Sequence, residues 1–126
     1  MPKEAIISPL VAPPLGPYSQ AIKVGPLLFC SGQLGLDADG NKVGNSVSKE
    51  TEQALENLKA VIEAAGARMD QVVKTTVFLA EMEDFKFMNQ VYERYFPLVP
   101  PARTTVAVAK LPKNAKVEIE AIVVIA

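Results

Sequence analysis

The chain has 126 residues, with 13 lysines and arginines, 14 aspartates and glutamates, and no histidine. Cys30 is the only cysteine, so one chain can form neither an internal disulfide nor a zinc site of the usual Cys/His type. The lack of histidine also excludes Ser-His-Asp and Cys-His nucleophiles. A formal net charge of -1 creates no field that would attract nucleic acid, so we expect no nucleic-acid partner.

Nothing in the sequence predicts a membrane segment or a secretory signal. The longest apolar run, 121–126, is far shorter than the ~20 residues that span a bilayer. The N-terminus lacks a charged segment followed by an apolar one, so a cytoplasmic protein is expected. Hydrophobic residues make up 49% of the chain, which suggests that other subunits cover part of its apolar surface. We expect one domain, residues 1–126.

The first third of the chain predicts an arm and a hairpin. Four prolines occur between residues 9 and 17, which predicts an extended arm lying over the body of the protein. Segments 19–24 and 27–31 flank Gly25-Pro26 and are typical of a β-hairpin. A second turn is predicted at 37–41, which is rich in Asp, Asn and Gly.

Two helices and three strands are predicted in the rest. Apolar residues at 3.6-residue spacing predict a helix over 48–65, with Gly66 as its C-cap. A strand rich in β-branched residues follows at 72–79. A second amphipathic helix is predicted over 84–96, ending before Pro97.

Two strands complete the chain, at 104–109 and 116–125, joined by the turn 111–114. The order ββ-α-β-α-ββ predicts an α+β fold, a single mixed β-sheet with two helices on one face. The uncovered sheet face again predicts an oligomer.

The last two strands carry the best candidates for chemistry. Arg103 opens the first, and its guanidinium is suited to binding a planar carboxylate through two hydrogen bonds. On the second strand, alternation places Glu118 and Glu120 on the face away from the helices. We expect the turn at 111–114 to bring Glu118 back toward the strand of Arg103, where the glutamate could orient a water. Together they predict a site for a small acid.

Five segments resemble the reactive-intermediate (enamine/imine) deaminase family, also called the YjgF or L-PSP endoribonuclease family. They are 16–21 (GPYSQA), 31–33 (SGQ), 73–79 (VKTTVFL), 101–103 (PAR) and 117–121 (VEIEA). The resemblance extends from about residue 6 to 124. It implies a chorismate-mutase-like fold and a homotrimer, with a central barrel and clefts between subunits. It also implies hydrolysis of 2-aminoacrylate, 2-aminocrotonate and similar enamine/imine acids to 2-keto acids and ammonia, without cofactor or metal.

The resemblance also implies roles for individual residues. Arg103 corresponds to the arginine that binds the substrate carboxylate, and Glu118 to the glutamate associated with the attacking water. Tyr18 and Ser31 match a tyrosine and a serine of the family's pocket, and Gly32 supplies a backbone amide.

Thr105 departs from the family pattern, because several bacterial deaminases carry cysteine there. That position contributes mainly through its backbone in the family, so the departure affects the detail of the pocket rather than the chemistry.

Other interpretations remain open. Arg103 could be a structural ion-pair partner, and Glu118 a solvated strand residue. Two alternative functions remain. One is an endoribonuclease that acts as a translation inhibitor, and the other is a non-catalytic trimer that binds a small acid and acts as a regulator.

Overall fold

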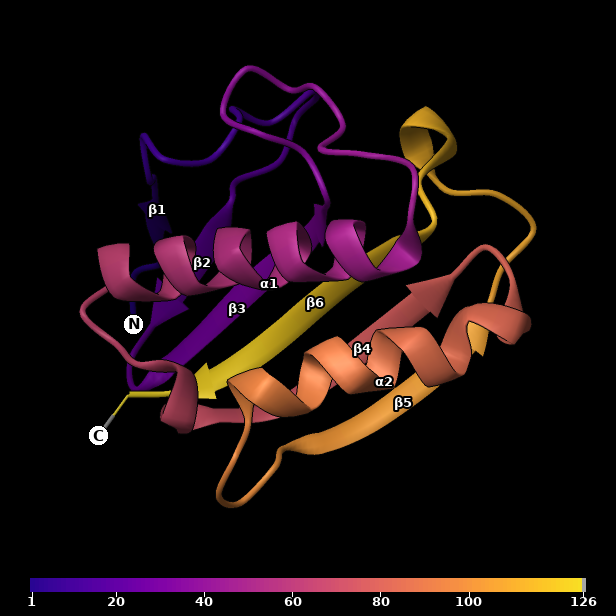
Figure 1. Ribbon diagram of the computed structural model, residues 1–126. Helices are drawn as coiled ribbons and strands as arrows, with labels where there is room; N and C mark the ends of the chain where they lie inside the picture. The colour runs from indigo at the N-terminus through magenta and orange to yellow at the C-terminus, as the bar shows by residue number, and fades with distance from the viewer. Residues whose placement is uncertain (126) are drawn as a thin grey trace.

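The computed structural model describes residues 1–125 and is organised around one six-stranded sheet of order β1-β2-β3-β6-β4-β5 (Figure 1). β4 and β5 are parallel and all other neighbours are antiparallel, so the predicted single mixed sheet is confirmed. The strands are β1 Glu4–Ile6, β2 Ala21–Val24, β3 Leu27–Leu34, β4 Val72–Leu79, β5 Ala102–Ala107 and β6 Val117–Val124.

Both α-helices lie on the same face of this sheet, as Figure 1 shows, which confirms the predicted α+β arrangement. They are α1 Val47–Ala64 and α2 Phe85–Tyr92. Four single-turn 3-10 helices accompany them: η1 Met69–Gln71, η2 Met82–Asp84, η3 Glu93–Tyr95 and η4 Pro112–Asn114. None of the helices in residues 1–125 is long and apolar enough to cross a membrane, and the cytoplasmic location stays a prediction.

Helix α1 begins one residue before its predicted start. The Ser46 side chain accepts a hydrogen bond from the backbone N–H of Lys49, which satisfies an otherwise free donor of the first turn. Gly66 follows the helix with φ +81°, the left-handed conformation that its lack of a Cβ makes accessible. The second helix is shorter than predicted, because α2 ends at Tyr92 and continues only as η3.

The core lies between the helices and the sheet. Side chains on one face of β6 are buried, and those on the other face are exposed or half-buried, as alternation predicts. Phe29, Val106 and Val124 are exposed on the sheet face away from the helices. We call this the open face. Beside these apolar side chains it carries Glu118 and Glu120, and nothing covers it in the single chain.

The N-terminal segment includes a short strand that the sequence did not predict, because β1 pairs with β2. One sequence expectation is wrong. The turn before β6 does not bring Glu118 beside the strand of Arg103. β6 inserts between β3 and β4, so that β4 separates it from β5. This central position gives β6 hydrogen-bonding partners on both edges.

Candidate active site

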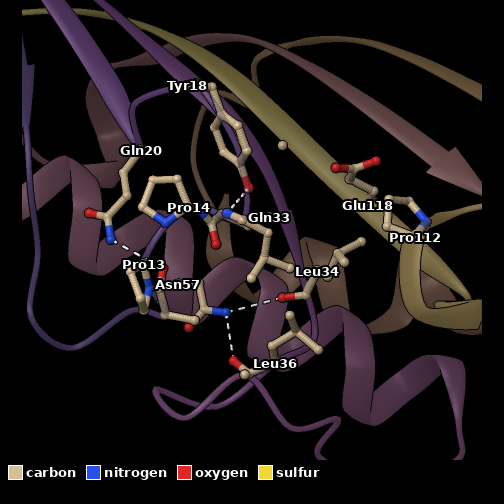
Figure 2. A pocket seen from close by; sticks show the side chains of 14 residues that line it. Pro13, Pro14, Tyr18, Gln20, Gln33, Leu34, Leu36, Asn57, Pro112 and Glu118 are labelled. Carbon is tan, nitrogen blue, oxygen red and sulfur yellow. Dashed lines mark hydrogen bonds between the residues drawn. The ribbon is translucent and has the colours of Figure 1, made fainter.

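Glu118 lies in a cavity of about 230 Å³ on the open face of the sheet (Figure 2). Strand β6 supplies the glutamate, β3 supplies the floor, and the N-terminal arm supplies one wall. We call it the glutamate cavity; its lining includes Pro14, Tyr18, Gly32, Leu36, Pro112 and Glu118. Three of the predicted site residues, Tyr18, Gly32 and Glu118, are therefore brought together by the fold.

The carboxylate of Glu118 lies directly against the backbone of Gly32. A Cβ on Gly32 would be 2.6 Å from Glu118 Oε2, so no larger residue fits there without displacing the carboxylate. The regular β3–β6 register is interrupted between Cys30 and Gln33, and such irregularities often re-aim side chains beside active sites.

The pKa of Glu118 is raised above its ordinary value. Burial is the main cause, since a half-buried carboxylate loses hydration, and the negative charge of Glu120 adds to it. A carboxyl group shifted in this direction exchanges protons closer to neutral pH, which suits acid–base catalysis.

Tyr18 and Ser31 both organise the arm at the edge of this cavity. The Tyr18 hydroxyl accepts a hydrogen bond from the N–H of Leu15 at 3.3 Å. The Ser31 hydroxyl donates to the carbonyl of Ser19 at 2.7 Å, and the Ser31 N–H donates to the carbonyl of Gln20 at 3.0 Å. Ser31 thus joins the arm to β3 beside Tyr18 and does not itself line the glutamate cavity.

Arg103 lies in a separate cleft of about 430 Å³ between β5 and α2. We call it the arginine cleft; it is lined by Asn89, Tyr92, Phe96, Pro100, Pro101 and Arg103, among others. The guanidinium carbon is 4.7 Å from the centre of the Tyr92 ring and 5.5 Å from that of Phe85. These cation–π contacts hold the charged group in place without neutralising it.

No carboxylate lies within 4.0 Å of the Arg103 guanidinium nitrogens in residues 1–125, so the ion-pair interpretation of Arg103 has no support within one chain. The two salt bridges among these residues involve Arg68 and Arg94 instead. Arg103 therefore keeps its donors available for an incoming anion, for which its planar fork is well suited.

Asn89 is a residue that the sequence reasoning missed. Its Oδ1 is buried without a hydrogen-bond partner, and it lines the arginine cleft. Such an unpaired group is unfavourable unless a ligand or water completes it. The signal was present in the sequence, because Asn89 follows Phe85 by four residues and precedes Tyr92 by three, which places an amide on the apolar side of α2.

Thr105 follows Arg103 by two residues on the helix-facing side of β5. Its Oγ1 is also buried without a partner. Thr105 does not line the glutamate cavity. The fold therefore associates it with Arg103 and not with Glu118.

The two halves of the predicted site lie on opposite faces of the sheet. Arg103 points toward α2, Glu118 points to the open face, and β4 lies between their strands. A small acid cannot contact both side chains of the same chain.

A family model described as Endoribonuclease L-PSP matches residues 10–125. The chain belongs to the endoribonuclease L-PSP family. This confirms the resemblance found in the sequence. The match covers both halves of the candidate site, from the arm to the end of β6.

Two curated relatives of this L-PSP family member are matched over most of their length. A Dermatophagoides farinae protein named 2-iminobutanoate/2-iminopropanoate deaminase is 49% identical over 125 residues, which is 98% of each chain. A human protein of the same name is 44% identical over 121 residues, covering 94% of this chain and 88% of the relative. The crystal structure of E. coli TdcF with bound serine has a TM-score of 0.93 at 35% identity, covering 98% of this chain and 99% of that one.

The described part of this L-PSP family member contains no group of three or more Asp, Glu, Cys or His side chains placed to hold a metal ion. Cys30 is buried, and burial raises the pKa of its thiol to about 12, so it is a poor metal ligand and a poor nucleophile. The groups available to a substrate include the Arg103 guanidinium, the Glu118 carboxylate and the amides of Asn89 and Gln33. Glu93 also lines the arginine cleft.

Proposed function

We propose that this chain hydrolyses the C=N bond of small 2-imino acids, the tautomers of 2-aminoacrylate and 2-aminocrotonate, to 2-keto acids and ammonia. The observation that carries the proposal is that this chain is 44–49% identical, over 94–98% of its length, to proteins named 2-iminobutanoate/2-iminopropanoate deaminase. The chemistry of the two half-sites supports it, because such a substrate carries a carboxylate for Arg103 beside an electrophilic carbon for water held by Glu118.

The hydrolysis needs only these groups and water. Arg103 binds the substrate carboxylate through two charge-assisted hydrogen bonds and fixes the position of C2. Glu118 accepts a proton as the water oxygen bonds to C2, and the C=N electron pair moves to nitrogen, which takes a proton. The C–N bond of the carbinolamine then breaks, ammonia leaves, and the hydroxyl loses its proton as the keto group forms. One acid–base group of this kind contributes ~10²–10⁴ in rate.

We further infer that three chains assemble so that the arginine cleft of one subunit meets the glutamate cavity of the next. Two features support this. Each chain holds two half-sites that it cannot join by itself. Each chain also exposes Phe29, Val106 and Val124 on the open face, which a chorismate-mutase-like trimer would bury in a central barrel.

A coupled assay tests the proposed activity. A pyridoxal-phosphate dehydratase releases 2-aminoacrylate from serine, and the formation of keto acid is timed with and without this protein. We expect keto-acid formation to become faster in proportion to the added protein. An unchanged rate across a hundredfold range of concentration would reject imine hydrolysis and leave a carboxylate-binding regulator as the better interpretation.

The family description also names endoribonuclease activity, which the same preparation can test. Phosphate binding requires concentrated lysine and arginine, whereas this sequence has 13 basic and 14 acidic residues and no histidine. We expect a labelled single-stranded RNA to stay intact, with cleavage no greater than in an Arg103→Ala preparation made in parallel.

A further inference from the structure

The glutamate cavity extends beyond Glu118 into an apolar recess between the arm and the end of β3. Figure 2 shows Glu118 at one side of the cavity and Leu34 and Leu36 at another, with Pro13 and Pro14 of the arm across from them. Ala12 completes the arm side of the recess. The recess is thus continuous with the position at which Glu118 would hold the attacking water.

We infer that this recess binds the side chain of the substrate, and that it selects 2-imino acids with aliphatic side chains of three or four carbons. The inference rests on the proposed function, because it places the imine carbon next to Glu118. It goes further by naming a side-chain subsite and the residues that set its length.

The size of the cavity exceeds what the smallest imine needs. A water requires only about 10–15 Å³ of such space, so a cavity of about 230 Å³ accommodates several non-hydrogen atoms beyond the reacting centre. A substrate whose side chain is only a methyl group would leave most of the recess filled with water. Each further methylene of an aliphatic side chain that is buried there makes binding more favourable.

Two of the amide side chains that line the recess, Gln20 and Asn57, are already paired with the protein. Gln20 Nε2 donates to the carbonyls of Ser8, Val11 and Ala12, and its Oε1 accepts from the N–H of Ser8. Asn57 Nδ2 donates to the carbonyls of Leu34 and Leu36. The Asn57 Oδ1 accepts from Gln53 Nε2 at 2.8 Å.

These pairings use the N–H donors of Gln20 and Asn57, so neither amide has a free donor for the substrate. A polar side chain that entered would lose its water without compensation, which is unfavourable. The recess therefore favours aliphatic side chains through its apolar walls, which include Pro13, Leu34 and Leu36.

The test compares imines that differ only in the side chain. An amino-acid oxidase with catalase releases 2-imino acids in situ from alanine, 2-aminobutyrate, norvaline, leucine and asparagine, and their hydrolysis is timed. We expect kcat/KM to rise roughly fourfold for each methylene from alanine to norvaline, from ~0.8 kcal/mol per buried CH₂. The leucine-derived imine should be preferred over the nearly isosteric asparagine-derived one by about tenfold or more.

Ala12→Leu fills the recess from the arm. We expect the norvaline-to-alanine ratio of kcat/KM to fall by about tenfold in this variant. Ala38→Leu is the matched control, because Ala38 is exposed and outside the glutamate cavity, and its ratio should equal that of the unaltered protein. Equal ratios in all three proteins, or no rise with chain length in the unaltered protein, would overturn the subsite.

Binding of the 2-keto acid products separates this inference from the proposed function. Calorimetry with pyruvate and 2-oxopentanoate reports side-chain preference without turnover. Tighter binding of 2-oxopentanoate, lost in Ala12→Leu, together with no imine hydrolysis would retain the recess and reject the catalysis. Imine hydrolysis without any preference for side-chain length would retain the catalysis and reject the recess as a subsite.

Discussion

The Oε2 atom of Glu118 lies only 2.6 Å from the point where a Cβ on Gly32 would be. Close contact between a carboxylate and a strand backbone requires glycine at residue 32, because any side chain would occupy the same space. The relationship fixes Glu118 at one wall of its cavity and links the SGQ segment of β3 to the VEIEA segment of β6.

Replacing Gly32 with alanine should therefore displace the Glu118 carboxylate. A shift of about 1 Å in a reacting group can lower the rate by about 10²-fold, and we expect a loss of this size in kcat for imine hydrolysis. Gly16→Ala is the control, since a Cβ there would meet the Tyr18 ring at an ordinary 3.9 Å. Equal losses in the two variants would show that the contact with Glu118 is not responsible.

Arg103→Lys should lose most activity although it retains the positive charge. Lysine cannot form the two-pronged contact with a carboxylate, nor stack on Tyr92 and Phe85 as the guanidinium does. Hydrogen bonds to charged groups contribute ~1.5–3 kcal/mol each, so losing one or two lowers kcat/KM by roughly 10–10⁴-fold.

Thermal unfolding and light scattering on the same Arg103→Lys sample provide the control. We expect both to match the unaltered protein, because Arg103 has no ion pair within the described chain. Retained activity would contradict the carboxylate clamp. Dissociation would identify Arg103 as a structural residue.

Glu118 should determine the acid side of the pH–rate profile. The carboxylate is the form that accepts a proton, so the rate should fall as the pH drops through the pKa of Glu118, which burial raises above its ordinary value of 4.5. Glu118→Gln should lower kcat by ~10²–10⁴ and abolish this limb, while 2-keto acids still bind at Arg103.

Glu120→Gln provides a matched test of the cause of this shift. The charge of Glu120 contributes to the raised pKa of Glu118, so its removal should move the acid limb to lower pH and leave the plateau rate in place. For the Glu118→Gln variant of the preceding prediction, an acid limb of the pH–rate profile at the same pH as in the unaltered protein would assign that limb to another group.

The position of the two half-sites predicts complementation between inactive variants. Arg103→Ala and Glu118→Gln should each retain no more than about one hundredth of the unaltered activity when alone. Trimers reassembled from an equal mixture should recover about one quarter of the unaltered activity, because about one interface in four pairs an intact Arg103 with an intact Glu118 from the neighbouring chain.

Two measurements accompany this experiment. Light scattering should give three times the 13.6 kDa mass of one chain. A charged residue on the open face, as in Val106→Lys, should dissociate the assembly and remove the recovered activity. No recovery in mixed assemblies of the right mass would mean that the two residues do not meet between chains.

Local features of the sequence determined much of this protein. The 3.6-residue spacing of apolar residues predicted both helices to within a few positions, and the period of two in β6 predicted that Glu118 faces away from them. The motifs around Tyr18, Ser31, Arg103 and Glu118 were sufficient by themselves to identify the family.

The tertiary structure alone decided how these residues are grouped. Local periodicity states which face a side chain occupies but not which strand lies beside it. The insertion of β6 between β3 and β4, which separates Glu118 from Arg103, therefore could not be derived from spacing. The same holds for the unpaired Asn89 Oδ1 and for the Ser31 hydroxyl bonded to Ser19, because hydrogen-bond satisfaction depends on neighbours distant in sequence. Side-chain direction is a property of one strand, whereas the site depends on which strands, and which chains, lie together.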